Sequence, residues 1–296
     1  MTFIDQLQSS EILILDGPMG TELHRRGVNI SLPLWSASAI WKRPEIIREI
    51  HEDYIDAGAD IITTNTFRTD ARTFRKAGLS EEDARNATYK AVELAREAIS
   101  RTSPDRKIWI AGSLSPLEDC YHPELSPGFK IAYHEHKIKT SWLLQASVDF
   151  ILIETMNTFD EALAATRAAL ETGLPTAASF ILKDKSHILN GAKIITAYEQ
   201  LKPEGIEIFS INCTHHSVVT EFLNTYADKI DIPIMVYVNA GFFDFQKGWQ
   251  EDSAFTPERY ASIARTWIDR GVRIIGGCCG TGPEFIRHLA KRKSPE

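Results

Sequence analysis

The amino-acid sequence predicts an α/β protein in which eight parallel strands form a TIM-type (β/α)8 barrel. Short runs rich in Ile and Val recur along the chain, and most of them lack polar–apolar alternation, as expected of parallel strands covered on both faces. Helix-compatible segments separate the runs, and eight strand–helix units are the number that closes such a barrel. The chain has 296 residues, which suits one barrel domain over residues 1–296.

The predicted strands and helices alternate along the chain. In order, the strands cover residues 12–15, 61–64, 108–111, 150–153, 176–180, 206–211, 234–238 and 272–275. The first clear helix covers residues 44–57, because Pro44 suits a helix start, apolar residues follow at helical spacing and Gly58 ends the pattern. Further helices are predicted over residues 84–99, 132–146, 158–171, 218–227 and 257–270. Residues 183–205 show the weakest pattern and predict a polar loop followed by a short helix.

Composition and charge exclude several classes of protein. The net charge is −7, which argues against a nucleic-acid or anionic-membrane surface. No apolar run reaches the roughly 18 residues that a membrane span requires, and the first residues lack a signal-peptide pattern, so a cytoplasmic location is expected. Four cysteines in a chain of this length do not form a disulfide framework, and a reducing compartment leaves thiols free to bind metal.

Chemically active residues follow the predicted strands at their carboxyl ends, where the active sites of such barrels lie. Several of these segments combine glycines with Asp, Asn, Glu or Cys. They are Asp16-Gly17-Pro18-Met19-Gly20-Thr21, Asn65-Thr66-Phe67, Gly112-Ser113-Leu114-Ser115-Pro116, Glu154-Thr155, Asn212-Cys213 and Asn239-Ala240-Gly241. We therefore expect these segments to surround one site.

Two adjacent cysteines, Cys278 and Cys279, follow the eighth strand and are flanked by glycines. Successive side chains of a strand point to opposite faces, so the glycines are expected to let the backbone turn until both thiols face one point. Cys213 follows the sixth strand. Three thiols at neighbouring strand ends suit a zinc ion whose fourth position stays open, as in catalytic zinc sites. Burial as ordinary apolar cysteines is the alternative.

Read in order, these segments resemble the homocysteine S-methyltransferase family over residues 13–286. The terminal Gly-Gly-Cys-Cys-Gly-Thr is the most specific motif. Residues 34–37 and 44–49 look like the single-domain branch that uses S-methylmethionine or S-adenosylmethionine. The resemblance implies that Cys213, Cys278 and Cys279 bind Zn2+ and leave the fourth position to substrate, so His215 is not expected to be a ligand. It also makes Asn239 a possible transient ligand in the absence of homocysteine.

The resemblance implies homocysteine as the acceptor, contacted by Asp16, Gly17, Met19, Asn65 and Glu154. The two carboxylates would bind its ammonium group through charge-assisted hydrogen bonds. Backbone N–H groups of residues 17–21, at a helix start, would hold its carboxylate. The alternative for Asp16 is an ordinary turn residue before glycine.

The implied activity is methyl transfer from a sulfonium donor, with S-methylmethionine ahead of S-adenosylmethionine, to the zinc-activated thiolate of homocysteine, which yields methionine. No further catalytic group is expected, because a sulfonium leaves as a neutral thioether. The alternatives are another donor, either betaine or methyltetrahydrofolate, or a zinc-binding barrel with a non-catalytic regulatory role. A zinc hydrolase or aldolase would usually take its ligands from His and carboxylates.

Two features of the predicted barrel mouth concern the donor. Aromatic faces attract cations, and six aromatic residues near strand ends or in loops could face a sulfonium, although packing within loops is expected for most of them. They are Trp35, Phe67, Tyr237, Phe243, Phe245 and Trp249. Residues 114–127 would also lie at the mouth, and their sequence is not assigned to a characterised branch. Cys120, within this stretch, is expected to be an ordinary free thiol.

Overall fold

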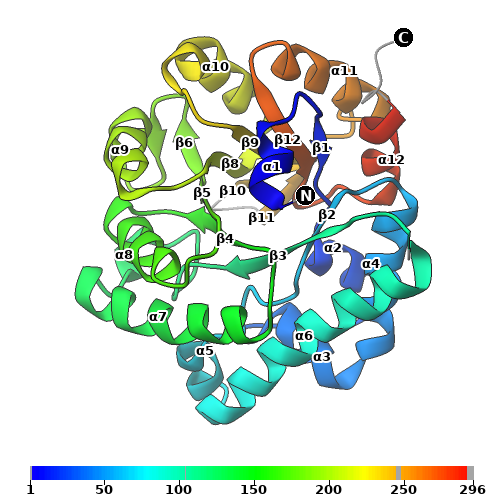
Figure 1. Ribbon diagram of the computed structural model, residues 1–296, viewed down its shortest axis with the longest axis vertical. Helices are drawn as coiled ribbons and strands as arrows, with labels where there is room; N and C mark the ends of the chain where they lie inside the picture. Colours follow the sequence, from blue (N-terminus) through cyan, green and yellow to red (C-terminus); the bar gives the residue numbers. More distant parts are fainter. Residues whose placement is uncertain (1, 104, 245–247, 292–296) are drawn as a thin grey trace.

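Eight parallel strands curve into a barrel in the computed structural model, which describes residues 2–103, 105–244 and 248–291 (Figure 1). The hydrogen-bonded order is β1-β12-β9-β8-β5-β4-β3-β2, and a parallel bridge between Leu15 and Ile61 joins the two end strands. The strands are β1 (Leu13–Ile14), β2 (Ile61–Thr63), β3 (Trp109–Leu114), β4 (Phe150–Met156), β5 (Thr176–Phe180), β8 (Ile208–His215), β9 (Ile234–Asn239) and β12 (Val272–Gly277). All eight predicted strands and the predicted barrel are confirmed.

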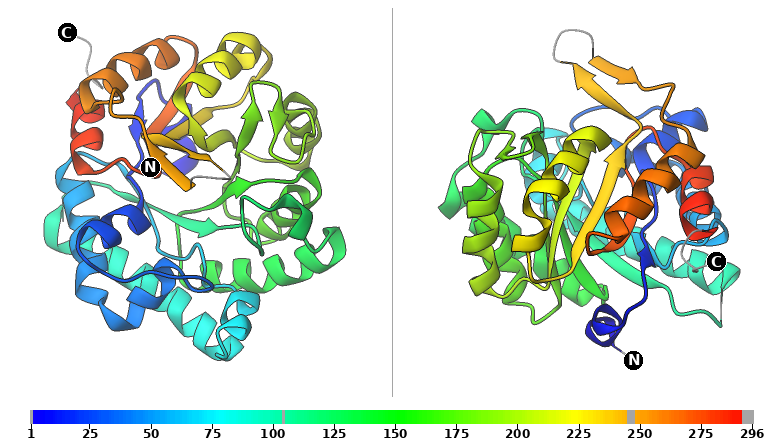
Figure 2. Two further views of the ribbon diagram at one scale, coloured as in Figure 1. Left: turned by 180° about the vertical axis from the view of Figure 1, so that it is seen from behind. Right: turned by 90° about the horizontal axis from the view of Figure 1, so that it is seen from above.

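Helices surround the strands, and all but α1 lie around the outside of the barrel (Figures 1 and 2). They are α1 (Phe3–Gln8), α2 (Met19–Arg25), α3 (Ala39–Lys42), α4 (Pro44–Asp56), α5 (Ala71–Lys76), α6 (Glu81–Thr102), α7 (Phe129–Gln145), α8 (Phe159–Leu170), α9 (Ile194–Leu201), α10 (His216–Tyr226), α11 (Pro257–Ile268) and α12 (Pro283–Lys291). Local signals set several starts: Ser80 and Asp83 form a capping box at α6, and Thr158 caps α8. Each of the six predicted helices is present, with ends shifted by at most three residues.

The short helix α1 closes the amino-terminal end of the barrel, a feature that the sequence pattern did not predict. Phe3 stacks on Phe150 with ring centroids 4.2 Å apart and lies 5.3 Å from Trp109. Leu7 is also buried in this interior cluster. Because apolar side chains plug this end, a ligand can enter the barrel only from the carboxyl ends of the strands.

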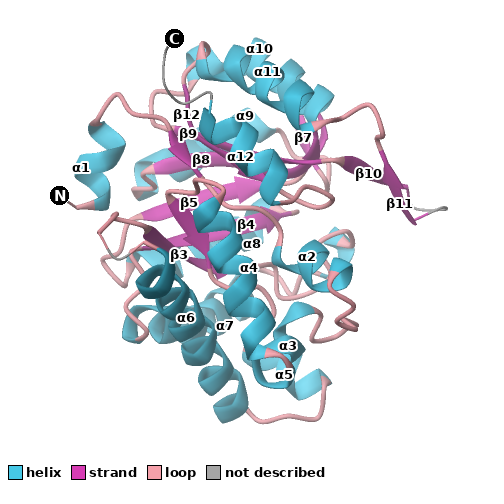
Figure 3. Ribbon diagram, turned by 90° about the vertical axis from the view of Figure 1, so that its right-hand side faces the viewer, coloured by secondary structure: helices cyan, strands magenta, loops and turns pink. Residues whose placement is uncertain are grey.

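Two β-hairpins extend from the opposite end of the barrel. One pairs β6 (Leu182–Asp184) with β7 (His187–Ile188), and with α9 it forms the segment in which a polar loop and a short helix were predicted. The other pairs β10 (Gly241–Asp244) with β11 (Gly248–Glu251) directly after β9, and Figure 3 shows it projecting beyond the barrel. Among the described residues, no helix is both long and apolar enough to cross a membrane.

His51, on α4, is a polar residue whose burial in the helical layer is unfavourable for folding. Its side chain is fully buried, and neither ring nitrogen has a hydrogen-bond partner within the described part of the chain. Burial lowers the pKa of His51 from 6.5 to about 3, because the charged imidazolium would lose its hydration. The unfolded chain therefore binds a proton more tightly than the folded chain does. Stability that depends on neutral His51 is complete above pH 6.5 and decreases as the pH falls from 6.5 towards 3.

Replacing His51 with Leu should make the protein less sensitive to acid. In the wild type, protonation of an unfolded histidine one pH unit below its pKa costs about 1.4 kcal/mol of stability. The free energy of unfolding of His51→Leu, measured with urea at pH 8 and pH 5.5, should therefore fall less than that of the wild type by about that amount. His134→Leu, at an exposed position of α7, is the matched control and should follow the wild type. Parallel pH profiles for His51→Leu and wild type would contradict this account.

Candidate active site

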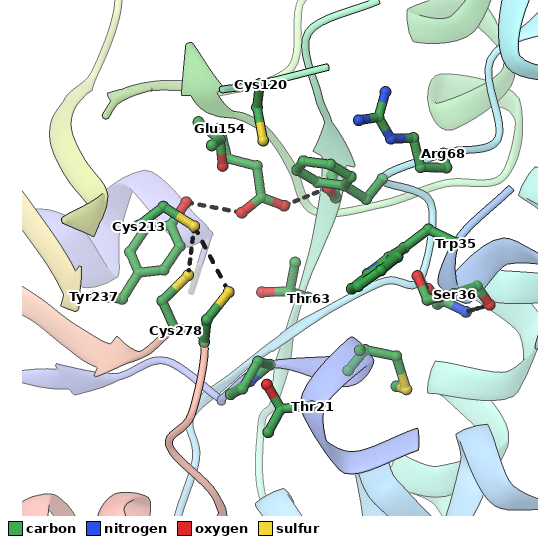
Figure 4. A pocket seen from close by; sticks show the side chains of 18 of the residues that line it. Thr21, Trp35, Ser36, Thr63, Arg68, Cys120, Glu154, Cys213, Tyr237 and Cys278 are labelled. Carbon is green, nitrogen blue, oxygen red and sulfur yellow. Dashed lines mark hydrogen bonds between the residues drawn. The ribbon is translucent and has the colours of Figure 1, made fainter. Parts of the chain in front are cut away.

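A cavity of about 430 Å³ opens at the carboxyl ends of the strands (Figure 4). Every one of the five residues predicted to bind substrate lines it, and so do the three predicted metal-binding cysteines. The predicted substrate-binding residues are Asp16, Gly17, Met19, Asn65 and Glu154, and the predicted metal ligands are Cys213, Cys278 and Cys279. Trp35, Phe67 and Tyr237 also line the cavity, whereas Phe245 and the side chains of Phe243 and Trp249 lie outside the described part of the structure.

Three thiols converge on one side of this cavity. The Sγ atom of Cys213 lies 3.1 Å from that of Cys278 and 3.9 Å from that of Cys279, and all three sulfur atoms lie within 4.8 Å of one another. Sulfur atoms that bind one tetrahedral zinc ion at 2.3 Å are about 3.8 Å apart. The three thiols could therefore hold a metal ion after small adjustments, and their chemistry suits zinc.

The backbone at the ends of β8 and β12 brings these thiols together. Cys213 has a φ of 50°, an uncommon conformation for a residue with a side chain, and the β8–β9 register shifts between Asn212 and His215. Gly276 and Gly277 do not supply the expected sharp turn, because neither has a positive φ. They instead allow close packing: a Cβ atom on Gly277 would lie 2.2 Å from Thr281 Oγ1. The turn itself falls at Gly280, whose φ is 83°.

Proximity couples the ionisation of the three thiols. Hydrogen bonds to Cys278 and Cys279 raise the pKa of Cys213, whereas hydrogen bonds from Cys213 and Cys278 lower the pKa of Cys279. Three thiolates this close, one buried and two partly buried, would repel one another in the absence of a cation. A divalent cation would remove that repulsion and stabilise all three thiolates.

Asn239, the last residue of β9, lies between the strands that carry the thiols. The sheet order places β9 between β8 and β12, and the neighbours of Asn239 bond directly to the cysteine loop: Cys278 N–H donates to Val238 O and Ala240 N–H donates to Cys279 O, both at 2.8 Å. The side-chain Oδ1 of Asn239 is buried, and the described residues offer it no hydrogen-bond donor. The unpaired oxygen of Asn239 therefore belongs to the strand between those that carry the thiols, although Asn239 does not itself line the cavity.

Two buried carboxylates line the same cavity as the thiols. Asp16 accepts hydrogen bonds from Thr63 N and Oγ1, both at 2.8 Å. Glu154 accepts one from Tyr237 Oη at 3.0 Å and a short one from Ser113 Oγ. Burial raises the pKa of both carboxyl groups, and in Asp16 the nearby Glu154 raises it further. Neither carboxylate forms an ion pair with a Lys or Arg in the described structure, so a bound cation would be strongly favoured.

Residues 16–21, called the glycine loop below, follow β1 and lead into α2. The first turn of α2 lines the cavity at Met19, Gly20 and Thr21. The first N–H groups of a helix have no partner within the helix and suit an anion. Gly17 is required by packing rather than by conformation, because a Cβ atom there would lie 2.6 Å from the hydroxyl of Tyr54.

Asn65 lines the cavity, and its amide group holds the Trp35–Ser36 turn. Ser36 Oγ donates to Asn65 Oδ1 at 2.7 Å, and Asn65 Nδ2 donates to Ser36 O at 3.0 Å. The turn is strained, since Trp35 has a φ of 48°. The indole of Trp35 then packs so closely over the glycine loop that a Cβ atom on Gly20 would lie 2.7 Å from its Nε1.

A family-model comparison identifies residues 13–293 with "Homocysteine S-methyltransferase". The chain belongs to this family. It is 32% identical to homocysteine S-methyltransferase YbgG of Bacillus subtilis, with 96% of this chain and 95% of the relative covered, and 32% identical to homocysteine S-methyltransferase of Escherichia coli, with 97% and 96% covered. The solved structure of the Escherichia coli homocysteine methyltransferase MmuM in its metallated form has a TM-score of 0.85, at 30% identity over 97% of this chain and 98% of that chain.

Within this family fold, His215 does not join the three cysteines. Its Nε2 lies 3.6 Å from Asp252 Oδ2, and its Nδ1 contacts Ser217 Oγ at 2.8 Å. Its ring therefore belongs to a separate group of side chains. The expectation that His215 is not a ligand of the cysteine site agrees with this placement.

Residues 114–127 form one wall of the cavity, as expected for a segment at the mouth. Asp119, Cys120, Tyr121 and His122 line it. Glu161 on α8 anchors this loop, because it accepts from Leu117 N at 2.7 Å and from Ser126 Oγ at 2.8 Å. Burial raises the pKa of Cys120 to about 12, so this thiol stays neutral, as the prediction of an ordinary free thiol requires.

Arg68 is a site residue that the sequence analysis missed. It follows the Asn65-Thr66-Phe67 segment, is only 7% exposed and lines the cavity on the Cys120 side (Figure 4). Its Nη1 donates to Glu118 O at 2.9 Å, and its guanidinium lies 5.4 Å from the ring centre of Phe67. Arg68 makes no ion pair with a carboxylate of the described residues. Its position directly after a strand-end motif was the signal that could have identified it.

Proposed function

We propose that this protein is a zinc-dependent homocysteine S-methyltransferase that uses a sulfonium donor on one barrel domain over residues 1–296. One observation carries the proposal: the same cavity is lined by three converging thiols and by two buried carboxylates that form no ion pair with a Lys or Arg of the described residues. An amino acid that bears both a thiol and an ammonium group matches these two features together. Membership of the family agrees with this acceptor.

We assign the zinc site to Cys213, Cys278 and Cys279. Zinc bound there would supply the positive charge that lowers the pKa of the homocysteine thiol, so that the acceptor reacts as a thiolate. The protein's own contribution is to hold the thiolates at one end of a cavity closed from below by α1. We further propose that Asn239 Oδ1 occupies the fourth position when homocysteine is absent, because an amide oxygen is a weak ligand that a thiolate displaces.

The other end of homocysteine would be bound by the carboxylates and the glycine loop. Asp16 and Glu154 bind its ammonium group, while the loop at Gly17 and the first turn of α2 at Met19 present N–H groups to its carboxylate. Asn65 contributes by holding the Trp35–Ser36 turn over this loop. These contacts orient the sulfur atom towards the remaining space of the cavity.

For the donor, we propose S-methylmethionine ahead of S-adenosylmethionine. The homocysteine sulfur forms a new bond to the methyl carbon while the donor's S–C bond breaks, and its electron pair stays on the donor sulfur. The leaving thioether is neutral and needs no proton. Trp35, Phe67 and Tyr237 offer aromatic faces to the sulfonium, each contributing on the order of 0.5–2 kcal/mol. Arg68 would bind the carboxylate that both sulfonium donors carry.

Replacing Cys278 with Ala should remove zinc from the cysteine site. Two thiolates cannot hold the ion as three do, so metal analysis of the purified variant should find one zinc ion fewer per chain than in the wild type. Cys120→Ala is the matched control, because it removes a thiol from the same cavity and should leave zinc in place. If Cys278→Ala kept its zinc at this site, the ligand assignment would be wrong.

Replacing Glu154 with Gln should weaken homocysteine binding while zinc remains. Loss of one charge-assisted hydrogen bond costs about 1.5–3 kcal/mol, or roughly 10- to 150-fold in the KM for homocysteine. Because burial raises the pKa of Glu154 and the ammonium group requires the ionised form, wild-type affinity should increase as the pH rises through that raised pKa. This pH dependence should be reduced in Glu154→Gln.

Glu207→Gln is the matched control for Glu154→Gln. Glu207 is also partly buried with a raised pKa, but it bonds to Thr176 N at the opposite end of the barrel. Its replacement should leave the KM for homocysteine unchanged. An unchanged KM in Glu154→Gln as well would mean that Glu154 has another role.

A panel of donors tests the reaction itself. Zinc-loaded protein with homocysteine and S-methylmethionine should form methionine faster than with S-adenosylmethionine. Arg68→Gln should raise the KM for the sulfonium donor by about 10-fold or more and leave the KM for homocysteine nearly unchanged, whereas Arg68→Lys should retain part of the affinity. Turnover with betaine or methyltetrahydrofolate, and none with either sulfonium, would overturn the donor assignment.

A further inference from the structure

A second group of metal-ligating side chains lies at the rim of the barrel, outside the cysteine site. His215 is the last residue of β8, His216 is the first residue of α10, and Asp252 follows β11. One ligand atom from each residue lies within 4.8 Å of the other two. The three residues therefore connect the strand that carries Cys213 to the β10–β11 hairpin.

The distances within this group fit a shared ion better than direct hydrogen bonds. The Nε2 atoms of His215 and His216 lie 3.6 Å and 3.5 Å from the same atom, Asp252 Oδ2. An N–H···O hydrogen bond usually spans 2.7–3.2 Å, so both pairs are longer than such a bond, although they lie within ion-pair distance when a histidine is protonated. Nitrogen and oxygen ligands bound to a tetrahedral ion at about 2.0–2.2 Å are separated by about 3.4 Å.

A second contact fixes the direction of each side chain. His215 Nδ1 contacts Ser217 Oγ at 2.8 Å and accepts a long hydrogen bond from Ser217 N–H at 3.4 Å. Binding of an ion at Nε2 requires the other tautomer, in which Nδ1–H donates to Ser217 Oγ and Nε2 keeps its lone pair. Asp252 Oδ1 accepts from Ala254 N at 3.0 Å, which leaves Oδ2 available. The ring of His216 stacks on Phe255, with centroids 4.6 Å apart and planes 5° from parallel. Such supporting contacts orient the ligands of metal sites.

We propose that His215, His216 and Asp252 form a second metal site, which binds a borderline divalent cation such as Zn2+ or Co2+ through two imidazoles and one carboxylate. This ligand set suits such ions, whereas the cysteine site is all sulfur. The proposal does not depend on the methyltransferase reaction, because no atom of the cysteine site takes part in it.

The second ion would attach the hairpin to the barrel. Asp252 is joined to the barrel through its backbone, since its N–H donates to Ala240 O at 3.1 Å, and Ala240 in turn bonds to Cys279 O. Figure 3 shows that β10 and β11 otherwise project away from the sheet. Three ligands from two segments far apart in the sequence would then hold the base of this hairpin against β8 and α10.

Cobalt titration of the full-length Cys278→Ala variant isolates the proposed site, because the cysteine site is disabled there. The variant should bind one Co2+ with a spectrum of nitrogen and oxygen ligation, without the charge-transfer band that cobalt–thiolate bonds give. Adding Asp252→Asn should weaken this binding by at least about 10-fold. Asp269→Asn, at an exposed position after α11, is the matched control and should bind like Cys278→Ala alone.

Three results would overturn the proposal: no Co2+ binding by Cys278→Ala, a thiolate band in its spectrum, or equal binding with and without Asp252→Asn. Circular dichroism of each variant verifies that the barrel is folded before titration. A failed methyl-transfer assay would leave this result unaffected, so the two proposals are tested separately.

Discussion

The closure of the barrel at Asp16 is the contact on which the site depends. The strand before it, β1, has only two residues, yet the backbone of Asp16 joins both neighbours: its N–H donates to Ile61 O, and its carbonyl accepts from Gly277 N, each at 3.0 Å. Gly276 must lack a side chain for this contact, because a Cβ atom there would lie 2.8 Å from Asp16 O. The same residue that closes the ring therefore sets the position of its own carboxylate and of the Cys278–Cys279 loop.

The cavity contains two carboxylates and three thiols whose negative charges are energetically unfavourable when no ligand is bound. Asp16 and Glu154 are each at least nine-tenths buried, and hydrogen bonds from Thr63, Ser113 and Tyr237 offset only part of the cost of their burial. Ionisation of three thiols so close together adds a second unfavourable free energy, which also arises from negative charge. Under the proposed function, cations would relieve both costs: a metal ion at the thiols and the substrate's ammonium group at the carboxylates. The barrel holds these groups in place before any ligand binds, so ligand binding does not have to order them.

The sequence was sufficient to predict the barrel and most of the site for one physical reason. Parallel strands buried on both faces are continuous apolar runs, and their carboxyl ends meet at one rim, so Glu154, Cys213 and Cys278 could be assigned to one site before the structure was known. Features that depend on distant partners could not be predicted. Examples are the plug formed by Phe3, the hydrogen bonds that occupy Asn65, and the close packing that requires Gly276 and Gly277.

The two ends of the cavity differ in how they are built. The groups proposed to bind the acceptor lie on or directly after barrel strands, where backbone hydrogen bonds fix them. The groups proposed to face the donor, Arg68 and residues 119–122, lie in loops anchored by non-local contacts such as Glu161 with Leu117 and Ser126. A barrel can change such loops without disturbing its strands. Loops can vary more readily than strand ends. Sequence differences within the family should therefore alter the choice of donor more readily than they alter the chemistry of the thiol.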